Sequence, residues 1–348
     1  FGSRNWDREI MGDQESVKQH ILNRLESSIR KHDKYVFSSS LKWWPAASII
    51  LVILSSALYI RSFKEQRIAH IPEIPRFRND ILPGDNIAVL TLDDGSRINL
   101  NDAKNGFLAR ESNTKIEKSP DGQLHYIAGA HIPGSKIKYN TITTPKGGQF
   151  QVMLPDGSRV WLNAGSSLRF PTSFTGIDRK VELKGEAYFE IAKNIQMPFI
   201  VHTDDSDIKV LGTHFNVMAY EDEKHTSTTL LEGSVQVLKG SDKLLIKPGE
   251  SAVLNKTTGS INVTVTDTEQ AIAWKNGYFI FDNENIESIM RKVSRWYNVE
   301  VTYSGNMNNK DFAGTRSRDK NVSELLKMLE LTGAVHFKIE GRRITVMP

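Results

Sequence analysis

An uncharged run from Trp43 to Ile60 interrupts a chain whose hydrophobic and polar positions otherwise alternate closely. As a helix, which rises about 1.5 Å per residue, the run would span about 27 Å, close to the hydrocarbon thickness of a bilayer. Trp43, Trp44 and Tyr59 stand at its two ends, where amphipathic rings favour the membrane interface. A cleaved signal peptide would lie nearer the start, and a buried helix would carry a polar stripe. The pattern therefore predicts one transmembrane helix over residues 43–60.

Ahead of this run, residues 1–42 show a helical period. Apolar side chains recur every four residues from Val17 to Ile29 on an otherwise charged helix, with Asp13 as a suitable N-cap. We predict a helical stub whose apolar stripe either packs against helices of its own domain or binds a helix of another protein. The candidate contact residues are Trp6, Ile10, Val17, Ile21, Leu25 and Ile29.

Residues 61–80 are charged and interrupted by proline, which is typical of an extended linker. Beyond them the pattern changes to short apolar runs separated by turns. "LDDGSRINLN" (Leu92–Asn101) and "LPDGSRVWLN" (Leu154–Asn163) are near copies, and Asp-Gly between alternating runs indicates a hairpin. The β-branched, period-two segments predict an antiparallel all-β domain over residues 81–268, built as a sandwich or as a short solenoid.

Residues 269–348 combine both periods in a β-α-β-β-α-β series that ends in a hairpin, which predicts a small α+β domain. One helix presents Ile286, Ile289, Met290, Val293 and Trp296 on one side. Strands at 277–281 and 299–303 are either internal to a sheet or form open edges to which a partner adds a strand. For the second alternative the contact candidates are Tyr278, Phe279, Ile280, Val299, Val301 and Tyr303.

The amino-acid composition and the motifs exclude several kinds of functional site. The chain has no cysteine, which excludes disulfides, thiolate metal ligands and thiol catalysis, and its net charge of +4 forms no basic block typical of nucleic-acid binding. The nine histidines show no metal-binding spacing, and no nucleotide-binding or hydrolase motif occurs. We therefore expect no metal, no cofactor, no direct contact with nucleic acid and no enzymatic activity.

Six motifs, in order, resemble the FecR family of membrane sigma-factor regulators. They are "TPKGGQFQVMLPDGSRVWLNAGSSLRFP" (Thr144–Pro171), "VELKGEAYFEIAK" (Val181–Lys193), "VLGTHFNV" (Val210–Val217), "LLEGSVQV" (Leu230–Val237), "KPGE" (Lys247–Glu250) and "AWKNGYFIF" (Ala273–Phe281). The final domain resembles the secretin/TonB short N-terminal (STN) type. The resemblance also implies that residues 1–42 are a shortened anti-sigma region, because that region is usually longer in the family.

The resemblance implies a signalling protein of the inner membrane, with a cytoplasmic N-terminus and its bulk in the periplasm. The periplasmic signalling domain of a TonB-dependent outer-membrane receptor would contact the C-terminal domain, and an extracytoplasmic-function sigma factor would bind the cytoplasmic part. The alternative is a membrane-anchored module whose all-β domain binds a glycan or another polymer. The apolar stripe before Trp43 favours signalling, because an anchor alone does not need it.

The Gly212-Thr213 pair lies in "VLGTHFNV", where some members resembling this sequence are cut. A threonine hydroxyl can attack the preceding carbonyl carbon and form an ester that water then opens. Glycine on the carbonyl side tolerates the strain that this attack needs. The alternative is a simple strand bend beside a packed Phe215.

Overall fold

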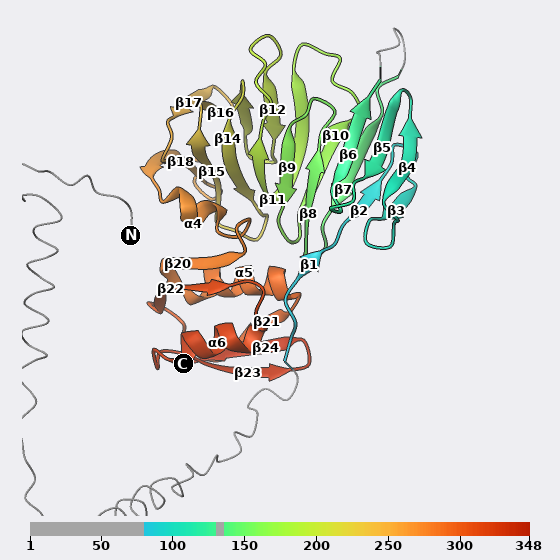
Figure 1. Cartoon of the computed structure of the whole chain (residues 1–348). Helices are drawn as coiled ribbons and strands as arrows, with labels where there is room; N and C mark the ends of the chain where they lie inside the picture. Colours follow the sequence, from blue (N-terminus) through green and yellow to red (C-terminus); the bar gives the residue numbers. More distant parts are fainter. Residues whose placement is uncertain (1–79, 130–135) are drawn as a thin grey trace, which may run out of the picture. The chain divides into compact units, whose positions relative to one another are not determined.

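The computed structural model describes residues 80–129 and 136–348 (Figure 1). The predicted stub, transmembrane helix and most of the linker lie outside these residues, as do the candidate residues Trp6, Ile10, Val17, Ile21, Leu25, Ile29, Trp43, Trp44 and Tyr59. Within residues 80–129 and 136–348, no helix is both long enough and apolar enough to cross a membrane.

Two sheets that share one hydrophobic core form the β domain (Figure 1). In order across the first sheet come β3 (Arg97–Asn99), β2 (Val89–Thr91), β7 (Tyr139–Thr143), β10 (Ser167–Pro171), the first half of β11 (Arg179–Glu190), β12 (Phe199–His202), β13 (Asp207–Val210), β16 (Val235–Lys239) and β17 (Asp242–Ile246). The second sheet contains β4 (Gly106–Glu111), β5 (Thr114–Lys118), β6 (Leu124–Ala128), β8 (Gly148–Met153), β9 (Arg159–Leu162), the second half of β11, β14 (His214–Ala219), β15 (His225–Glu232), β18 (Glu250–Asn255) and β19 (Ile261–Val265).

From β12 onward, successive hairpins alternate between the two sheets. The domain is therefore a sandwich that grows along one direction, which combines features of the two predicted alternatives. Most strand pairs are antiparallel, as predicted, but β1 (Asp85–Asn86) and β6 each pair with β8 in parallel, and β11 pairs with β12 in parallel. The last pairing arises because β11 passes from the first sheet into the second, so the chain must return before β12 can lie beside its first half.

The passage of β11 between the sheets occurs at Gly185, which has φ +87°. A Cβ atom there would lie 2.4 Å from the hydroxyl oxygen of Ser166, so only glycine fits this conformation and this contact. The two near-copy segments form the hairpins β2–β3 and β8–β9, as predicted. In both, the turn glycine has positive φ, +84° at Gly95 and +83° at Gly157.

The C-terminal module follows the short helix α4 (Thr268–Ile272). Its elements are β20 (Tyr278–Asn285), α5 (Ile286–Tyr297), β21 (Glu300–Tyr303), β22 (Asp311–Ser317), α6 (Val322–Glu330), β23 (His336–Glu340) and β24 (Arg343–Met347). These elements follow the predicted series, and the final hairpin supplies two strands. They form two small sheets, β20–β22 and β21–β24–β23, around a second core. The five side chains predicted for one side of α5 are all buried.

Candidate functional site: the junction of the β domain and the C-terminal module

Two arginines of α5 bind two acidic residues in the turn after β14. The Arg295 guanidinium lies 3.0 Å from Asp222 Oδ1 and 2.5 Å from Glu223 Oε1, and Arg291 Nε donates to Glu223 Oε2 at 2.9 Å. Arg295 also lies over the ring of Tyr220, 4.0 Å from its centroid. Burial would raise the pKa of Glu223, but the two arginines hold it below its usual value. This cluster fixes the orientation of α5 against the β domain.

A buried carboxyl group lies beside this cluster. Glu186 on β11 accepts hydrogen bonds from Asn163 Nδ2 at 2.7 Å and from Asn216 Nδ2 at 3.0 Å. Asn216 in turn accepts one from Trp274 Nε1 at 3.1 Å, in the segment that enters the C-terminal module. Burial raises the pKa of Glu186 above its usual value, although both asparagines favour the charged form. The protonation of Glu186 is thus linked to contacts between the β domain and the C-terminal module.

Arg318, which follows β22, completes the junction. Its Nη1 donates to the Trp274 carbonyl at 2.7 Å and its Nη2 to Asn163 Oδ1 at 3.0 Å, while the guanidinium stacks 3.7 Å from the Trp296 ring centroid. Burial lowers the pKa of Arg318 to about 10, so it stays charged at neutral pH. Glu186, Arg295 and Arg318 all line a cavity of about 260 Å³ at this junction.

The residues just before β1 bind the C-terminal module. We call Asp80–Gly84 the strap. The Asp80 carboxylate accepts hydrogen bonds from Ser323 Oγ at 2.7 Å and from Ser323 N at 3.1 Å, and the Ile81 carbonyl accepts one from Val322 N at 3.0 Å. Asp80 therefore caps α6, whose own N-cap residue, Asn321, makes no side-chain capping hydrogen bond. The Ile81 side chain is 6% exposed and belongs to the core of the module.

Gly84 ends the strap at a tight contact. A Cβ atom at this position would lie 2.6 Å from the carbonyl oxygen of Gly147 and 2.8 Å from the Trp296 ring. Gly147 N donates to the Arg295 carbonyl at 2.7 Å, and Asp85 N donates to the Gly147 carbonyl at 2.9 Å. The strap, the β7–β8 turn and the end of α5 thus meet at one place. The strap connects this junction to the part of the chain that precedes Asp80.

The predicted contact strands of the module lie at sheet edges. In the part of the chain that the structure describes, β20 pairs only with β22 and β21 only with β24. Tyr278 and Tyr303 are exposed, at 47% and 41%, whereas Phe279 and Val299 are buried in the module core. Ile280 and Val301 are half-buried. The six candidates are therefore not one surface, and only the two tyrosines are freely accessible.

Gly212 and Thr213 lie between β13 and β14. Gly212 has φ +153°, and a Cβ atom there would lie 2.7 Å from Lys193 Cα. Thr213 is buried, and its hydroxyl donates to the Ser234 carbonyl at 3.0 Å. Phe215 stacks on Phe189 with ring centroids 5.0 Å apart. Gly212 thus bends the chain beside a packed Phe215. The Thr213 hydroxyl donates to a backbone carbonyl, which cannot act as a base that activates it.

The sequence alone did not indicate the junction residues. Glu186, Arg295 and Arg318 occupy different elements, and each partner is distant in sequence: 155 positions separate Arg318 from Asn163. One signal was present. Arg291 and Arg295 stand four residues apart at the border of the apolar side of α5, where long side chains reach a neighbouring surface.

Comparison with known proteins places these parts in a family. The family model described as FecR protein matches residues 140–236, and the model described as FecR, C-terminal, matches residues 278–346. No curated protein matches the chain significantly.

Two crystal structures of a candidate anti-sigma factor from Parabacteroides distasonis ATCC 8503, at 1.65 Å and 2.50 Å resolution, are similar to the chain. The first is 33% identical with a TM-score of 0.56, and the alignment covers 59% of this chain and 97% of that one. For the second the identity is 31% and the TM-score 0.57, with coverages of 60% and 98%.

Proposed function

The chain belongs to the FecR family, and on that premise we propose that it is an anti-sigma factor or sigma regulator in which the C-terminal module controls the segment before residue 80. Support for the regulatory role comes from the family and from the similar Parabacteroides distasonis structures, which are described as those of a candidate anti-sigma factor. In this role the protein is a non-enzymatic binding protein whose partner is a sigma factor.

The observation that carries the proposal is the strap. A regulator must pass a binding event at one end of the chain to the other end. Ile81 lies in the core of the C-terminal module and Asp80 caps α6, although Ser323, which binds Asp80, lies 243 positions further along the chain. A change in the module therefore acts on the chain at residue 80 without passing through the whole β domain.

The proposal also specifies where the protein is located in the cell and which proteins it binds. We place the chain in the inner membrane, spanning it once over residues 43–60, with a cytoplasmic N-terminus and a periplasmic C-terminal part. The periplasmic signalling domain of a TonB-dependent receptor would add a strand to β20 or β21, the open edges beside Tyr278 and Tyr303. This would be the function of an STN-like module, and an extracytoplasmic-function sigma factor would bind the apolar stripe from Val17 to Ile29.

Retention of a sigma factor by the full chain tests the proposal. The tagged chain is purified in detergent from its native cells, and retained proteins are identified by mass spectrometry. Leu25→Asp, on the apolar stripe, should lower sigma-factor retention about tenfold or more, because a buried leucine contributes about 1.5–3 kcal/mol. Asn23→Asp, on the opposite side of the same predicted helix, serves as the control and should retain the sigma factor. If the unchanged chain retains no sigma factor, the proposal is wrong.

Self-cleavage between Gly212 and Thr213 is a separate part of the proposal. The strained glycine and the adjacent hydroxyl supply the reacting groups, and the Thr213 hydroxyl would have to turn from the Ser234 carbonyl toward the Gly212 carbonyl carbon. We expect the wild-type protein to give two fragments on a denaturing gel and Thr213→Ala to stay intact. Thr257→Ala, in an exposed turn, should be cut like the wild type. Intact bands for all three proteins would contradict this step.

A further inference from the structure

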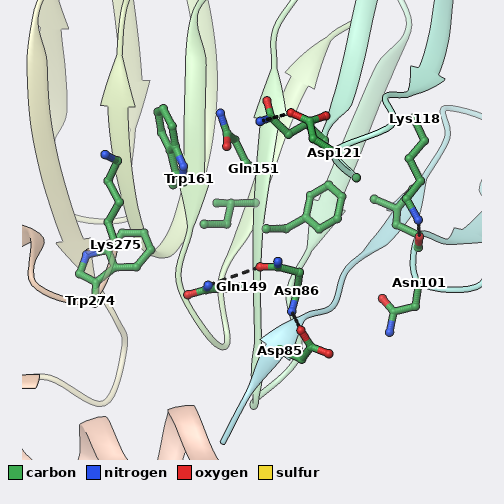
Figure 2. A pocket seen from close by; sticks show the side chains of 15 residues that line it. Asp85, Asn86, Asn101, Lys118, Asp121, Gln149, Gln151, Trp161, Trp274 and Lys275 are labelled. Atoms are coloured by element: carbon green, nitrogen blue, oxygen red, sulfur yellow. Dashed lines mark hydrogen bonds between the residues drawn. The ribbon is translucent and has the colours of Figure 1, made fainter. Parts of the chain in front are cut away.

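A polar cleft of about 410 Å³ opens on the second sheet, apart from the cavity at the junction (Figure 2). Its base is apolar, formed by Leu100, Phe150 and Leu162, all of which are buried. Figure 2 shows Trp161, Trp274 and Lys275 on one side and Lys118 and Asp121 on the other. Between them stand four amide or carboxylate side chains from β1 and β8, namely Asp85, Asn86, Gln149 and Gln151.

The charges around the cleft balance. Two carboxylates, Asp85 and Asp121, accompany two ammonium groups, Lys118 and Lys275. The Lys118 ammonium already donates to the carbonyls of Leu100 and Ala103, at 2.7 and 3.0 Å, so two of its three N–H donors are occupied. An ionic ligand therefore finds no excess of opposite charge here.

The remaining polar groups are mainly side-chain amides, each of which both donates and accepts hydrogen bonds. They are Asn86, Asn101, Gln123, Gln149 and Gln151. Within residues 80–129 and 136–348, the side-chain amides of Asn101 and Gln151 make no hydrogen bond to the protein. Paired donors and acceptors of this kind match hydroxyl groups, which also do both.

Trp161 gives the cleft an aromatic side. Lys275 Nζ lies 4.6 Å from the ring centroids of both Trp161 and Tyr188. The Arg159 guanidinium, which pairs with Glu190 of β11, lies 5.7 Å from the Trp161 centroid, so both cations are on the side of the indole that faces β11. The other side of the indole faces β8, where Gln151 is its direct cross-strand neighbour (Figure 2). An apolar ring face beside a row of amides suits a ligand that is apolar on its ring faces and polar at its edge.

We propose that this cleft binds an uncharged oligosaccharide, with one sugar ring against Trp161 and its hydroxyls on Gln149, Gln151 and Asn101. The cleft also joins three parts of the molecule: β1 continues the strap, β8 and β9 belong to the sandwich, and Lys275 leads into the C-terminal module. A bound saccharide contacts all three. Saccharide binding at this site does not require sigma-factor binding, so the two proposals fail independently.

Isothermal titration calorimetry on the purified full chain tests the proposal. The probes are three neutral hexasaccharides (maltohexaose, cellohexaose and mannohexaose) and one acidic oligosaccharide, hexagalacturonate. We expect saturable binding of at least one neutral probe and weaker binding of the acidic one. Absence of binding by all three neutral probes, or tighter binding of hexagalacturonate, overturns the proposal.

Substitutions in the cleft test whether the saccharide binds there. Trp161→Ala and Gln151→Ala should each weaken the bound neutral probe about two- to tenfold, through loss of the ring contact and of an amide hydrogen bond. Gln236→Ala, an amide on β16 of the other sheet, should leave the affinity unchanged. Thermal melting checks folding, and if Trp161→Ala does not fold, Gln151→Ala decides. Wild-type affinity in the folded cleft variants overturns the proposal.

Discussion

At the scale of single residues, buried ionisable groups gather at the junction. Arg295, Glu223, Arg318 and Glu186 are each less than 10% exposed, whereas such side chains are rarely buried unless they are paired. A buried ion pair adds little net stability compared with apolar packing, but removing one partner is costly because the other charge stays uncompensated. These contacts therefore hold the β domain and the C-terminal module in one orientation. They also make the separation of the two from each other cooperative.

Glu186 makes the stability of the protein depend on pH. Its folded-state pKa is raised, so between its unfolded pKa and its folded pKa the native state holds more protons, and stability falls as pH rises. Glu186→Gln removes this dependence. The stability of the variant relative to the wild type should therefore increase with pH above about pH 4.5, at a limiting slope of about 1.4 kcal/mol per pH unit.

Thermal unfolding from pH 4 to pH 8 measures this difference. Glu182→Gln is a matched control on the same strand, because Glu182 is exposed and pairs with the exposed Arg169. Its profile should run parallel to that of the wild type. Parallel profiles for Glu186→Gln and the wild type would show that the buried carboxyl group does not titrate in this range.

Residue patterns predicted the local features well and the long-range contacts poorly. Asp-Gly identified two hairpin turns because a positive φ at glycine is a property of a few neighbouring residues. The partners of Glu186 could not be found in this way. Asn216 lies on β14 and Asn163 directly follows β9, and only the fold brings the three side chains together.

At the scale of elements, periodicity predicted the strands and helices of the C-terminal module in their correct order. It also predicted the buried side of α5, since a helix of that length shows its period clearly. The division of the module into two sheets was not predictable, because strand pairing depends on contacts between distant segments. For the same reason, the composition of residues 61–80 indicated a linker but not that Asp80, at its end, caps α6.

The strap binds the same module that carries the open strand edges, so binding of a partner at an edge can affect how the strap is held. β21 pairs with β24 on one side and offers its other edge to a partner strand. The module core to which β21 contributes Val301 also contains Ile81 of the strap. A partner that alters the packing of this core would therefore change how firmly the strap is held.

At the scale of the whole molecule, three sites share structural parts. The junction, the saccharide cleft and the strap meet around β1 and the segment at Trp274, which lines both the cleft and the junction cavity. Ligands at different sites are coupled when each favours the same arrangement of the shared parts. This architecture suits a regulator that combines more than one input.

In the proposed function, the strap carries the signal from the C-terminal module to the segment before residue 80. Ile81→Asp places a charge in the module core and should detach the strap. Leu82→Asp changes the next residue, which is 72% exposed, and should leave the strap in place. Each variant replaces the natural protein in its cells, and its abundance and thermal stability are checked first.

The deciding measurement is the level of transcripts that depend on the sigma factor retained by the chain. We predict that Ile81→Asp changes these levels and abolishes their response to the inducing condition, while Leu82→Asp behaves like the wild type. A normal response in cells that carry stable Ile81→Asp protein would show that the strap does not carry the signal.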